Sequence, residues 1–483
     1  MRMNYSLIIL EIAVVALGLG LLLADLWTPT ALKHKLGYVA AAGVGLILVG
    51  SFALHVSEPQ YAFGEMYVLD GLALFFKRFF LLAALIVLLM SNEFADRIES
   101  GISEFYALIL FALAGMMFAA SANDFSLLFV SLELITVTFY ILTSFQRSRL
   151  TSLEAGVKYL ILGALSSAFL VYGIALVWGT TGKMNFGELS PVALQFAGNK
   201  VFLFGILLVL VGLGFKIAAF PFQMWAPDVY QGAPVPTTAF LAVGSKAAGF
   251  VLLLRVLFSA VPEITVQWTK LLIVISAITI LYGNLCAIPQ RNLKRLLGYS
   301  SIANAGYLLM GVAARSAAGQ SAILYYLSGY LFTLLAAFTV ICLVMRKVDG
   351  EDIGVLAGLH QRSPLLAVTM ALSMVSLAGM PPLAGFFGKL LLLKAVVEQG
   401  AAQSSYYWLV AVAIVGVVIS LYYYFGVIRA IYWSKDPADL SPIEISRPIQ
   451  VSLYGCIAGM LYLGVFPNAM VNLATEAVKA LKL

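Results

Sequence analysis

The sequence predicts an all-α polytopic membrane protein with about 14 transmembrane helices, in two inverted five-helix repeats with broken helices 7 and 12. Three observations predict this fold class. Hydrophobic residues make up 62% of the 483 residues and charged residues only 11%, a composition typical of polytopic membrane proteins. Apolar stretches long enough to cross a bilayer recur along the whole chain. Two of these stretches are too long for one crossing, and both contain prolines.

Apolar stretches of spanning length follow one another, with short polar loops between them. About 20 helical residues cross the bilayer core at 1.5 Å per residue. The predicted spans lie at residues 5–25, 37–54, 70–90, 105–120, 124–145, 154–178, 201–229, 236–258, 270–288, 297–313, 321–345, 365–398, 406–428 and 449–471. The first span is interpreted as a retained helix rather than a removed signal peptide, because no convincing cleavage site follows it.

The seventh and twelfth spans contain 29 and 34 residues and should be interrupted. Pro221 and Pro227 fall in the first of them, and Pro381 and Pro382 fall in the second. A proline removes a backbone donor and kinks or breaks a helix. The two breaks lie five helices apart. Because five is odd, a five-helix repeat would place its second copy upside down relative to the first, as in many transporters.

This spacing divides the chain into four parts. They are helices 1–3 at residues 1–104, a first antiporter-like repeat of helices 4–8 at residues 105–258, a second, inverted repeat of helices 9–13 at residues 270–432, and helix 14 with the tail at residues 449–483.

Positive charges are divided unequally between the two sets of alternating loops. Fourteen Lys and Arg residues occupy one set, including the Arg291–Arg295 cluster, and seven occupy the other set together with the termini. Because cytoplasmic loops carry the excess, we expect both termini on the outer side of the membrane. Lys77 and Arg78 lie in the third span and are expected to snorkel outward, which would narrow the difference to fourteen against nine.

Several charged residues fall inside the apolar stretches, where a charge at mid-bilayer costs roughly 2.5–3.5 kcal/mol. They are Glu133, Lys158, Lys216, Lys246 and Lys389. Such residues mark ion or proton pathways. Glu133 and Lys216 are lone charges of opposite sign, so we expect each to stabilise the other. For Lys158, an alternative is a helix pair with Glu154 near the cytoplasmic interface.

Other polar residues in apolar segments have simpler interpretations. Arg255 and Lys394 lie near the outer ends of their spans and are expected to snorkel. Glu11 lies midway along the first span, and we favour a structural hydrogen bond over a role in a proton path. The net charge of +6 is spread over the loops, and no nucleic-acid partner is expected.

The spacing of the cysteines and the lack of nucleotide-binding motifs in the sequence argue against a cofactor in this chain. Cys286, Cys342 and Cys456 lie far apart without a C-x-x-C pair, which predicts no disulfide framework, zinc site or iron–sulfur cluster. Neither G-x-G-x-x-G nor a P-loop is found in the sequence. We therefore expect neither a nucleotide site nor a redox centre.

Two of the buried lysines flank a proline-rich turn in the run GFKIAAFPFQMWAPDVYQGAPVPTTAFLAVGSKAAGF. This run resembles the antiporter-like subunits of respiratory complex I, and among them most closely the subunit N (chain 2) type. The resemblance extends to SLEL around Glu133, SLEAGVKYLILGALSSAFLVYG around Lys158, NLKRLLGYSSIANAGYLLMG, and PPLAGFFGKL around Lys389. Its most specific part is PDVYQGAP.

The resemblance implies a proton-translocating membrane-arm subunit of NADH:quinone oxidoreductase, an enzyme complex and translocase. The proton-relay positions of the family map onto Glu133, Lys158, Lys216, Lys246 and Lys389. The same resemblance places NADH, FMN, iron–sulfur clusters and quinone in partner subunits. It implies other membrane-arm and peripheral subunits and the lipid bilayer as partners, in a bacterial inner membrane with both termini on the periplasmic side. Gln223 departs from the family, which often has His there, and a glutamine cannot titrate.

Two other function classes stay open. A subunit of a multi-subunit cation/proton antiporter would share this fold and many of these motifs, although PDVYQGAP and Lys389 favour the complex I subunit. A non-transporting scaffold of a membrane complex would have no use for a buried glutamate and buried lysines.

Overall fold

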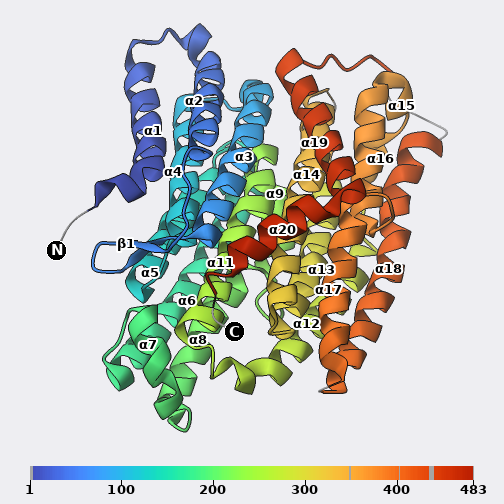
Figure 1. Cartoon of the computed structure of the whole chain (residues 1–483). Helices are drawn as coiled ribbons and strands as arrows, with labels where there is room; N and C mark the ends of the chain where they lie inside the picture. The colour runs from blue at the N-terminus through green and yellow to red at the C-terminus, as the bar shows by residue number, and fades with distance from the viewer. Residues whose placement is uncertain (1–3, 348–349, 402, 434–439, 482–483) are drawn as a thin grey trace.

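Helices account for nearly all of the structure, a computed structural model that describes residues 4–347, 350–401, 403–433 and 440–481. Figure 1 shows most of the helices standing side by side, with α20 lying across them. Within the described ranges, twelve helices are long and apolar enough to cross a membrane. They occupy the positions of twelve of the predicted spans, and the seventh and twelfth spans are each divided into shorter helices. The all-α membrane fold is confirmed, whereas the number of crossings and the inverted repeats stay predictions.

The N-terminal part contains three long helices and a small β-hairpin. Its elements are η1 (Tyr5–Ile8), α1 (Ile9–Trp27), η2 (Thr30–Lys35), α2 (Leu36–Ser51), β1 (Gln60–Ala62), β2 (Tyr67–Leu69), α3 (Gly71–Glu93) and η3 (Ala95–Arg97). The strands pair antiparallel, with Gln60 opposite Leu69. The sequence did not predict this hairpin, whose tight turn takes Phe63, Gly64 and Glu65 through positive φ angles.

The first broken helix lies in the next part of the chain. This part contains α4 (Ile102–Ala120), α5 (Phe125–Thr143), α6 (Leu150–Thr181), α7 (Phe186–Ala193), η4 (Leu194–Phe196), α8 (Lys200–Lys216), α9 (Trp225–Gly232), α10 (Val235–Phe240), η5 (Leu241–Ser245), α11 (Lys246–Arg255) and η6 (Val256–Ala260). Here η5 and η6 are π-helical turns, a feature that is frequent at functional sites.

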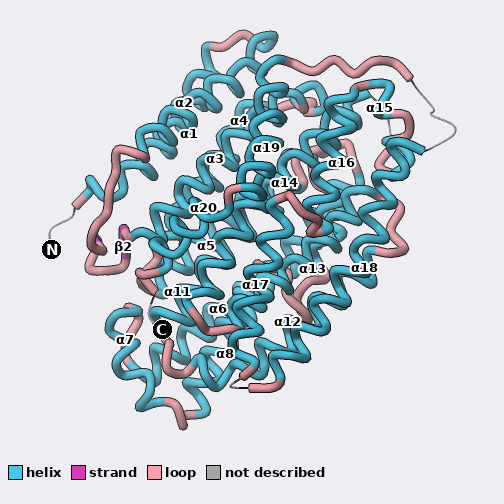
Figure 2. The backbone as a smooth tube through the Cα atoms, turned by 45° about the vertical axis from the view of Figure 1, so that its right-hand side comes forward, coloured by secondary structure: helices cyan, strands magenta, loops and turns pink. Residues whose placement is uncertain are grey.

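The second broken helix lies in the last part of the chain, where the break separates α16 from α17. The elements are α12 (Thr265–Ala287), α13 (Leu293–Ala313), α14 (Ala317–Lys347), η7 (Ile353–Leu356), α15 (Leu359–Arg362), α16 (Pro364–Ala378), α17 (Ala384–Gly400), α18 (Ser405–Trp433), α19 (Arg447–Val465) and α20 (Pro467–Val478). The predicted last span ends early, because the chain changes direction at Pro467, the first residue of α20. Helix α20 then packs against α3 and α14 (Figure 2).

A fully buried ion pair joins the first helix to the third. The Lys77 amine lies 2.8 Å from the Glu11 carboxylate, and neither side chain is exposed. The Tyr67 hydroxyl lies 3.1 Å from the same carboxylate, so the hydrogen bond expected for Glu11 is present. The expectation that Lys77 snorkels outward is wrong, because α1 supplies a counter-charge at the same depth.

A second buried ion pair ties the start of α3 to the end of α11. Arg255 is 2% exposed, and its two terminal nitrogens lie 3.1 and 2.9 Å from the Asp70 carboxylate. Asp70 also caps α3 by accepting from the Ala73 amide at 2.7 Å. The expected snorkelling of Arg255 is therefore wrong, because Asp70 neutralises the guanidinium inside the protein.

We predict that Asp70→Asn destabilises the chain by about 3–5 kcal/mol, because it leaves the buried Arg255 without a counter-charge. The measurement is the thermal inactivation temperature of the assembled membrane complex. Glu188→Gln is the matched control, since its pair with Lys183 is largely exposed and should contribute at most about 1 kcal/mol. Equal losses of stability in the two variants would contradict the prediction.

Candidate functional site

The first helix break lies immediately after Lys216, as predicted. α8 ends at this lysine, and α9 begins at Trp225 after an irregular segment that contains Pro221. The Trp225 indole nitrogen donates to the Phe215 carbonyl at 2.9 Å, and the Phe220 amide donates to the Thr279 hydroxyl at 3.0 Å. These contacts thus bind backbone groups at the break, including the Phe220 amide of the irregular segment, as a membrane interior requires.

The second break separates α16, which ends at Ala378, from α17, which begins at Ala384. Gly379 follows α16 with φ of +82°, a left-handed conformation that favours glycine. The Lys389 amine reaches back across the break and donates to the Leu377 carbonyl at 2.7 Å. A cation at the C-terminal end of a helix satisfies a free carbonyl and interacts favourably with the helix dipole.

Lys216 is buried at the end of α8 without a carboxylate beside it. The side chain is 3% exposed, and its amine has no hydrogen-bond partner among the described residues. The ring of Tyr159 is the nearby polarisable group, with its centre 5.9 Å from the amine. Glu133 instead accepts a short hydrogen bond from the Ser167 hydroxyl on α6. Glu133 and Lys216 therefore do not form a contact ion pair, although Glu133 still acts electrostatically on the Lys216 amine, as expected.

Lys158 lies in a more exposed ionic network that links three helices. Its side chain is 43% exposed, and its amine lies 2.7 Å from Glu154 on the same helix and 2.8 Å from Asp228 on α9. Asp228 also forms an ion pair with Arg295 on α13. The alternative pair with Glu154 is therefore present, together with a contact to the broken helix that the sequence did not predict.

Lys246 is buried at the first position of α11, directly after the π-helical turn η5. Its amine donates to the Ser301 carbonyl at 2.6 Å and forms a short hydrogen bond with the Ser301 hydroxyl. The Tyr230 hydroxyl lies 2.9 Å from the same serine oxygen. One residue of α13 therefore connects this lysine to the helix that follows the first break.

Polar side chains on α13 continue from this contact towards the second break. Ser300, Asn304 and Tyr307 are spaced by four and three residues, so they share one face of the helix. Asn304 accepts from the Tyr326 hydroxyl at 2.7 Å and donates to Ser300 at 3.4 Å. The Lys389 amine lies 4.9 Å from the centre of the Tyr307 ring. The buried face of α13 thus extends from the partner of one lysine to the ring beside another.

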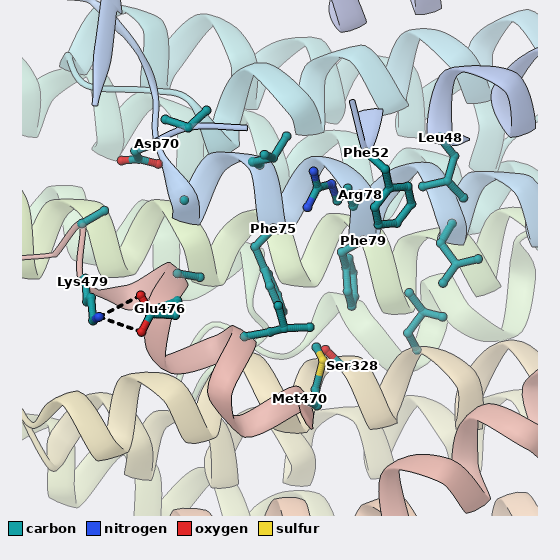
Figure 3. Close-up of a pocket in the computed structure, with 18 of the residues that line it drawn as sticks. Leu48, Phe52, Asp70, Phe75, Arg78, Phe79, Ser328, Met470, Glu476 and Lys479 are labelled. Atoms are coloured by element: carbon teal, nitrogen blue, oxygen red, sulfur yellow. Dashed lines mark hydrogen bonds and ion pairs between the residues drawn. The ribbon is translucent and has the colours of Figure 1, made fainter. Parts of the chain in front are cut away.

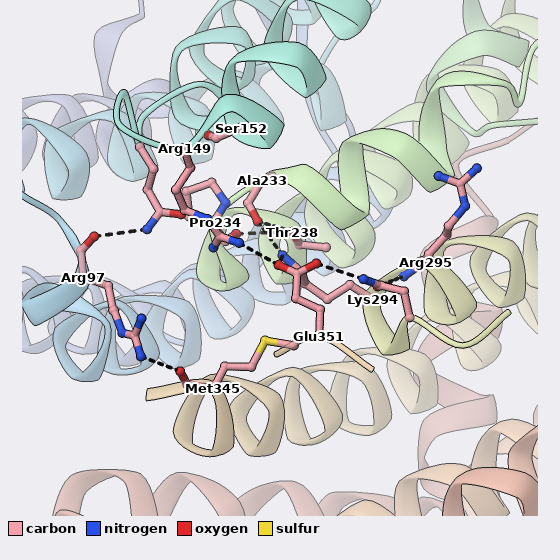
Figure 4. A network of polar contacts seen from close by, with 12 residues as sticks. Arg97, Arg149, Ser152, Ala233, Pro234, Thr238, Lys294, Arg295, Met345 and Glu351 are labelled. Carbon is pink, nitrogen blue, oxygen red and sulfur yellow. Dashed lines mark hydrogen bonds and ion pairs between the residues drawn. The ribbon is translucent and has the colours of Figure 1, made fainter. Parts of the chain in front are cut away.

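An ionic cluster around Glu351 lies at one end of the bundle (Figure 4). Glu351 contacts Arg149 at 3.0 Å, Lys294 at 3.1 Å and the Asn292 amide at 2.9 Å. Burial acts to raise the pKa of the Glu351 carboxyl, but these contacts outweigh burial and hold the pKa below its ordinary value. Its contribution to stability is therefore present above the unfolded-state pKa and is lost as the pH falls through the lowered value. Lys294 also donates to the Ala233 carbonyl at 3.1 Å, which ties the cluster to the junction of α9 and α10.

The structure brings together only part of the predicted residue set. Lys246 and Lys389 each contact a residue of α13, whereas Lys158 lies outside the buried group. Asp228 was not singled out, although an acidic residue in the PDVYQGAP segment was an available signal. Ser301 and Asn304 gave no signal, because small polar residues are common in membrane helices. In the part of the chain that the structure describes, no three His, Cys, Asp or Glu residues form a group that could hold a metal ion.

Comparisons with known proteins identify the family of this chain. The family model described as "NADH:quinone oxidoreductase/Mrp antiporter, TM" matches residues 122–420. A curated relative from Desulforamulus reducens, named NADH-quinone oxidoreductase subunit N, is 39% identical over 480 residues, covering 99% of each chain.

Solved structures show the same fold. A chain of respiratory complex I from Thermus thermophilus superposes with a TM-score of 0.81 and 32% identity, covering 97% of this chain and 100% of that one. A chain of the Mrp complex from Dietzia reaches a TM-score of 0.80 at 22% identity, covering 97% of both chains, and shows the fold alone. The chain therefore belongs to the family of membrane subunits shared by NADH:quinone oxidoreductases and Mrp antiporters, within the group that resembles NADH-quinone oxidoreductase subunit N.

Proposed function

We propose that this chain is a proton-translocating membrane-arm subunit of NADH:quinone oxidoreductase. Protons pass through a relay of Glu133, Lys158, Lys216, Lys246 and Lys389, coupled to quinone reduction elsewhere in the complex. Other membrane-arm and peripheral subunits are its partners. NADH, FMN, the iron–sulfur clusters and quinone belong to those partners, and the proposal assigns no redox centre to this chain.

One observation carries the proposal. Lys216, Lys246 and Lys389 are at most 4% exposed, and none of their amines forms an ion pair with an acidic residue in the described ranges. By contrast, the buried Lys77 and Arg255 each contact a carboxylate. Burial without a counter-ion brings the charged and neutral forms of an amine closer in free energy. These three lysines are thus suited to exchanging protons, whereas the paired cations are suited to holding the fold together.

The required change in proton affinity is modest. Moving a proton against about 150 mV costs roughly 3.5 kcal/mol. This free energy corresponds to a change of about 2.5 pKa units. A carboxylate that approaches or leaves a buried amine changes its proton affinity by this order. Glu133 is the acidic member of the relay, and its hydrogen bond to Ser167 on α6 is the contact that such a movement would break.

The face of α13 provides the lateral path between two of the amines. A proton leaving Lys246 would pass to the hydroxyl of Ser301, which the amine already contacts, while this hydroxyl gives its own proton to a water on its other side. Asn304 and Tyr326 extend the polar face, and Tyr307 brings it beside Lys389. The steps between these groups pass through water, which bridges polar groups nearly as well as a direct hydrogen bond does.

Lys158 is the member of the relay that contacts the broken helix through an ion pair. Its amine contacts Asp228 on α9, and the same carboxylate contacts Arg295 on α13. A change of charge on Lys158 would therefore change the electrostatic environment of α9, which lies between Lys216 and Lys246 in the sequence. This role differs from that of the buried lysines, because Lys158 is exposed and has acidic partners.

The two alternative functions are less well supported. A multi-subunit cation/proton antiporter shares the fold. However, the sequence identity to the Mrp chain is only 22%, whereas the identity to a curated subunit N is 39% over the full length. A scaffold without transport would gain nothing from three buried amines that lack counter-ions.

We predict that Lys389→Arg and Lys389→Ala both lose most proton translocation while the complex still assembles. A guanidinium with a pKa above about 12 keeps its proton in this energy range, and alanine removes the carrier. The measurement is dye-quenching proton uptake in inverted vesicles, normalised to assembled complex.

Lys394 provides the matched control on the same helix, because its side chain is 69% exposed. Lys394→Arg and Lys394→Ala should keep nearly normal uptake. Near-normal uptake in Lys389→Arg would show that Lys389 is a fixed positive charge and not a proton carrier.

We also predict the orientation in a bacterial inner membrane, with both termini on the periplasmic side. Arg291 and Glu263 are exposed residues beyond opposite ends of α12. Single cysteines at these positions, in a chain whose native cysteines are replaced, should react with a membrane-impermeant thiol reagent from opposite sides. Arg291→Cys should react from the cytoplasm and Glu263→Cys from the periplasm. Reaction of both from one side would overturn the predicted topology.

A further inference from the structure

An apolar groove lies between α2 and α3 on one wall and α14 and α20 on the other (Figure 3). Its volume is about 900 Å³. Phe52, Phe75, Phe79, Leu331 and Leu473 are among the lining residues. Two of them, Phe52 and Leu473, are 58% and 61% exposed, so the groove opens at the surface of the chain. None of these residues belongs to the proposed relay.

Arg78 is the charge that faces this groove without an acidic partner in the described ranges. Its terminal nitrogen donates to the carbonyls of Ser51 and Leu54 at 2.9 and 3.1 Å, beyond the end of α2. The guanidinium carbon lies 4.6 Å from the centre of the Phe52 ring. Its Nε is buried and has no hydrogen-bond partner among the described residues. These contacts hold the guanidinium in place while leaving donor capacity unused.

The other charged residues at the groove are compensated or exposed. Asp70 forms the buried pair with Arg255, and Glu476 forms an ion pair with Lys479 at 2.6 Å. Glu58 lies in the exposed loop at the edge of the groove. Arg78 is therefore the uncompensated positive charge at the apolar part of the groove, among the described residues.

The position of Arg78 corresponds to the level where lipid headgroups meet acyl chains. It lies seven residues after Gly71, the first residue of α3, which is about 10 Å along the helix axis at 1.5 Å per residue. Side chains on a helix tilt towards its N-terminus, so the guanidinium lies nearer the membrane surface than its Cα atom does. A long basic side chain of this kind places its charge at the interface.

We propose that this groove binds an anionic phospholipid, with its acyl chains against Phe52, which follows α2, and the phenylalanines of α3, and with its phosphate on Arg78. A guanidinium presents a planar fork of donors that matches phosphate oxygens. The apolar walls match acyl chains, which the surrounding bilayer supplies. The bound lipid would join α2 and α3 to α14 and α20. This proposal does not depend on proton transfer through the chain.

The charge at the groove favours a lipid over a helix from a neighbouring subunit. A membrane-crossing helix is predominantly apolar over about 20 residues and would leave the unused donors of Arg78 unpaired, whereas a lipid phosphate binds them. Acyl chains are thinner and flexible, so they can follow the groove between the aromatic side chains.

The test uses the purified membrane complex that contains this chain, reconstituted in nanodiscs. Phosphatidylglycerol and phosphatidylcholine carrying the same photoactivatable acyl chain are the two probes, and mass spectrometry locates the labelled peptides. We expect phosphatidylglycerol to label peptides of α2, α3, α14 and α20 several-fold more than phosphatidylcholine does.

Variants separate the headgroup contact from the apolar contact. Arg78→Gln should lower phosphatidylglycerol labelling to the level of phosphatidylcholine, and Leu331→Trp should lower both by filling the groove. Arg315→Gln is the control, because this arginine contacts Thr269 away from the groove. Equal labelling by the two lipids in the unaltered complex would overturn the proposal. So would unlabelled groove peptides, which would show that a neighbouring subunit covers them.

Discussion

A lysine amine placed in an apolar membrane interior must find polar partners, because leaving its charge unsolvated costs several kcal/mol. This chain meets the constraint in two ways. Where a lysine or arginine holds helices together, a carboxylate lies beside it, as Glu11 does for Lys77. In the proposed relay, carbonyl and hydroxyl oxygens and aromatic rings take the place of the carboxylate. The helix breaks matter because they supply carbonyl oxygens inside the bundle that an intact helix would keep for itself.

The second break shows this relation most directly. The Lys389 amine is bonded to Leu377, a carbonyl near the end of α16, and it faces the ring of Tyr307. Both groups stabilise a positive charge without fixing a proton as firmly as a carboxylate would. Lys246 is held similarly by Ser301. Lys246 and Lys389 thus each have a neutral polar environment, and residues of α13 contribute to both.

Much of the fold was predictable from the sequence because it depends on span length and proline position. Both breaks lie where Pro221 and Pro381 indicated. Tertiary partners were less accessible. Arg255 appeared able to snorkel because nothing near it in sequence marked Asp70 as its partner. The contact of Glu133 with Ser167, in place of Lys216, depends on how α5 packs against α6. Side-chain pairing across helices is set by packing that a linear pattern of apolar residues does not specify.

The central claim is that buried polar groups along α13 carry protons between two lysines. The most direct test is the number of protons translocated per NADH oxidised by the reconstituted complex carrying Asn304→Leu, which interrupts the polar face without removing an amine. Asn304→Ser, which keeps a polar group, is the matched control. The account predicts a lower ratio for leucine than for serine, with NADH oxidation retained in the presence of an uncoupler. An unchanged ratio in Asn304→Leu would contradict the path along α13.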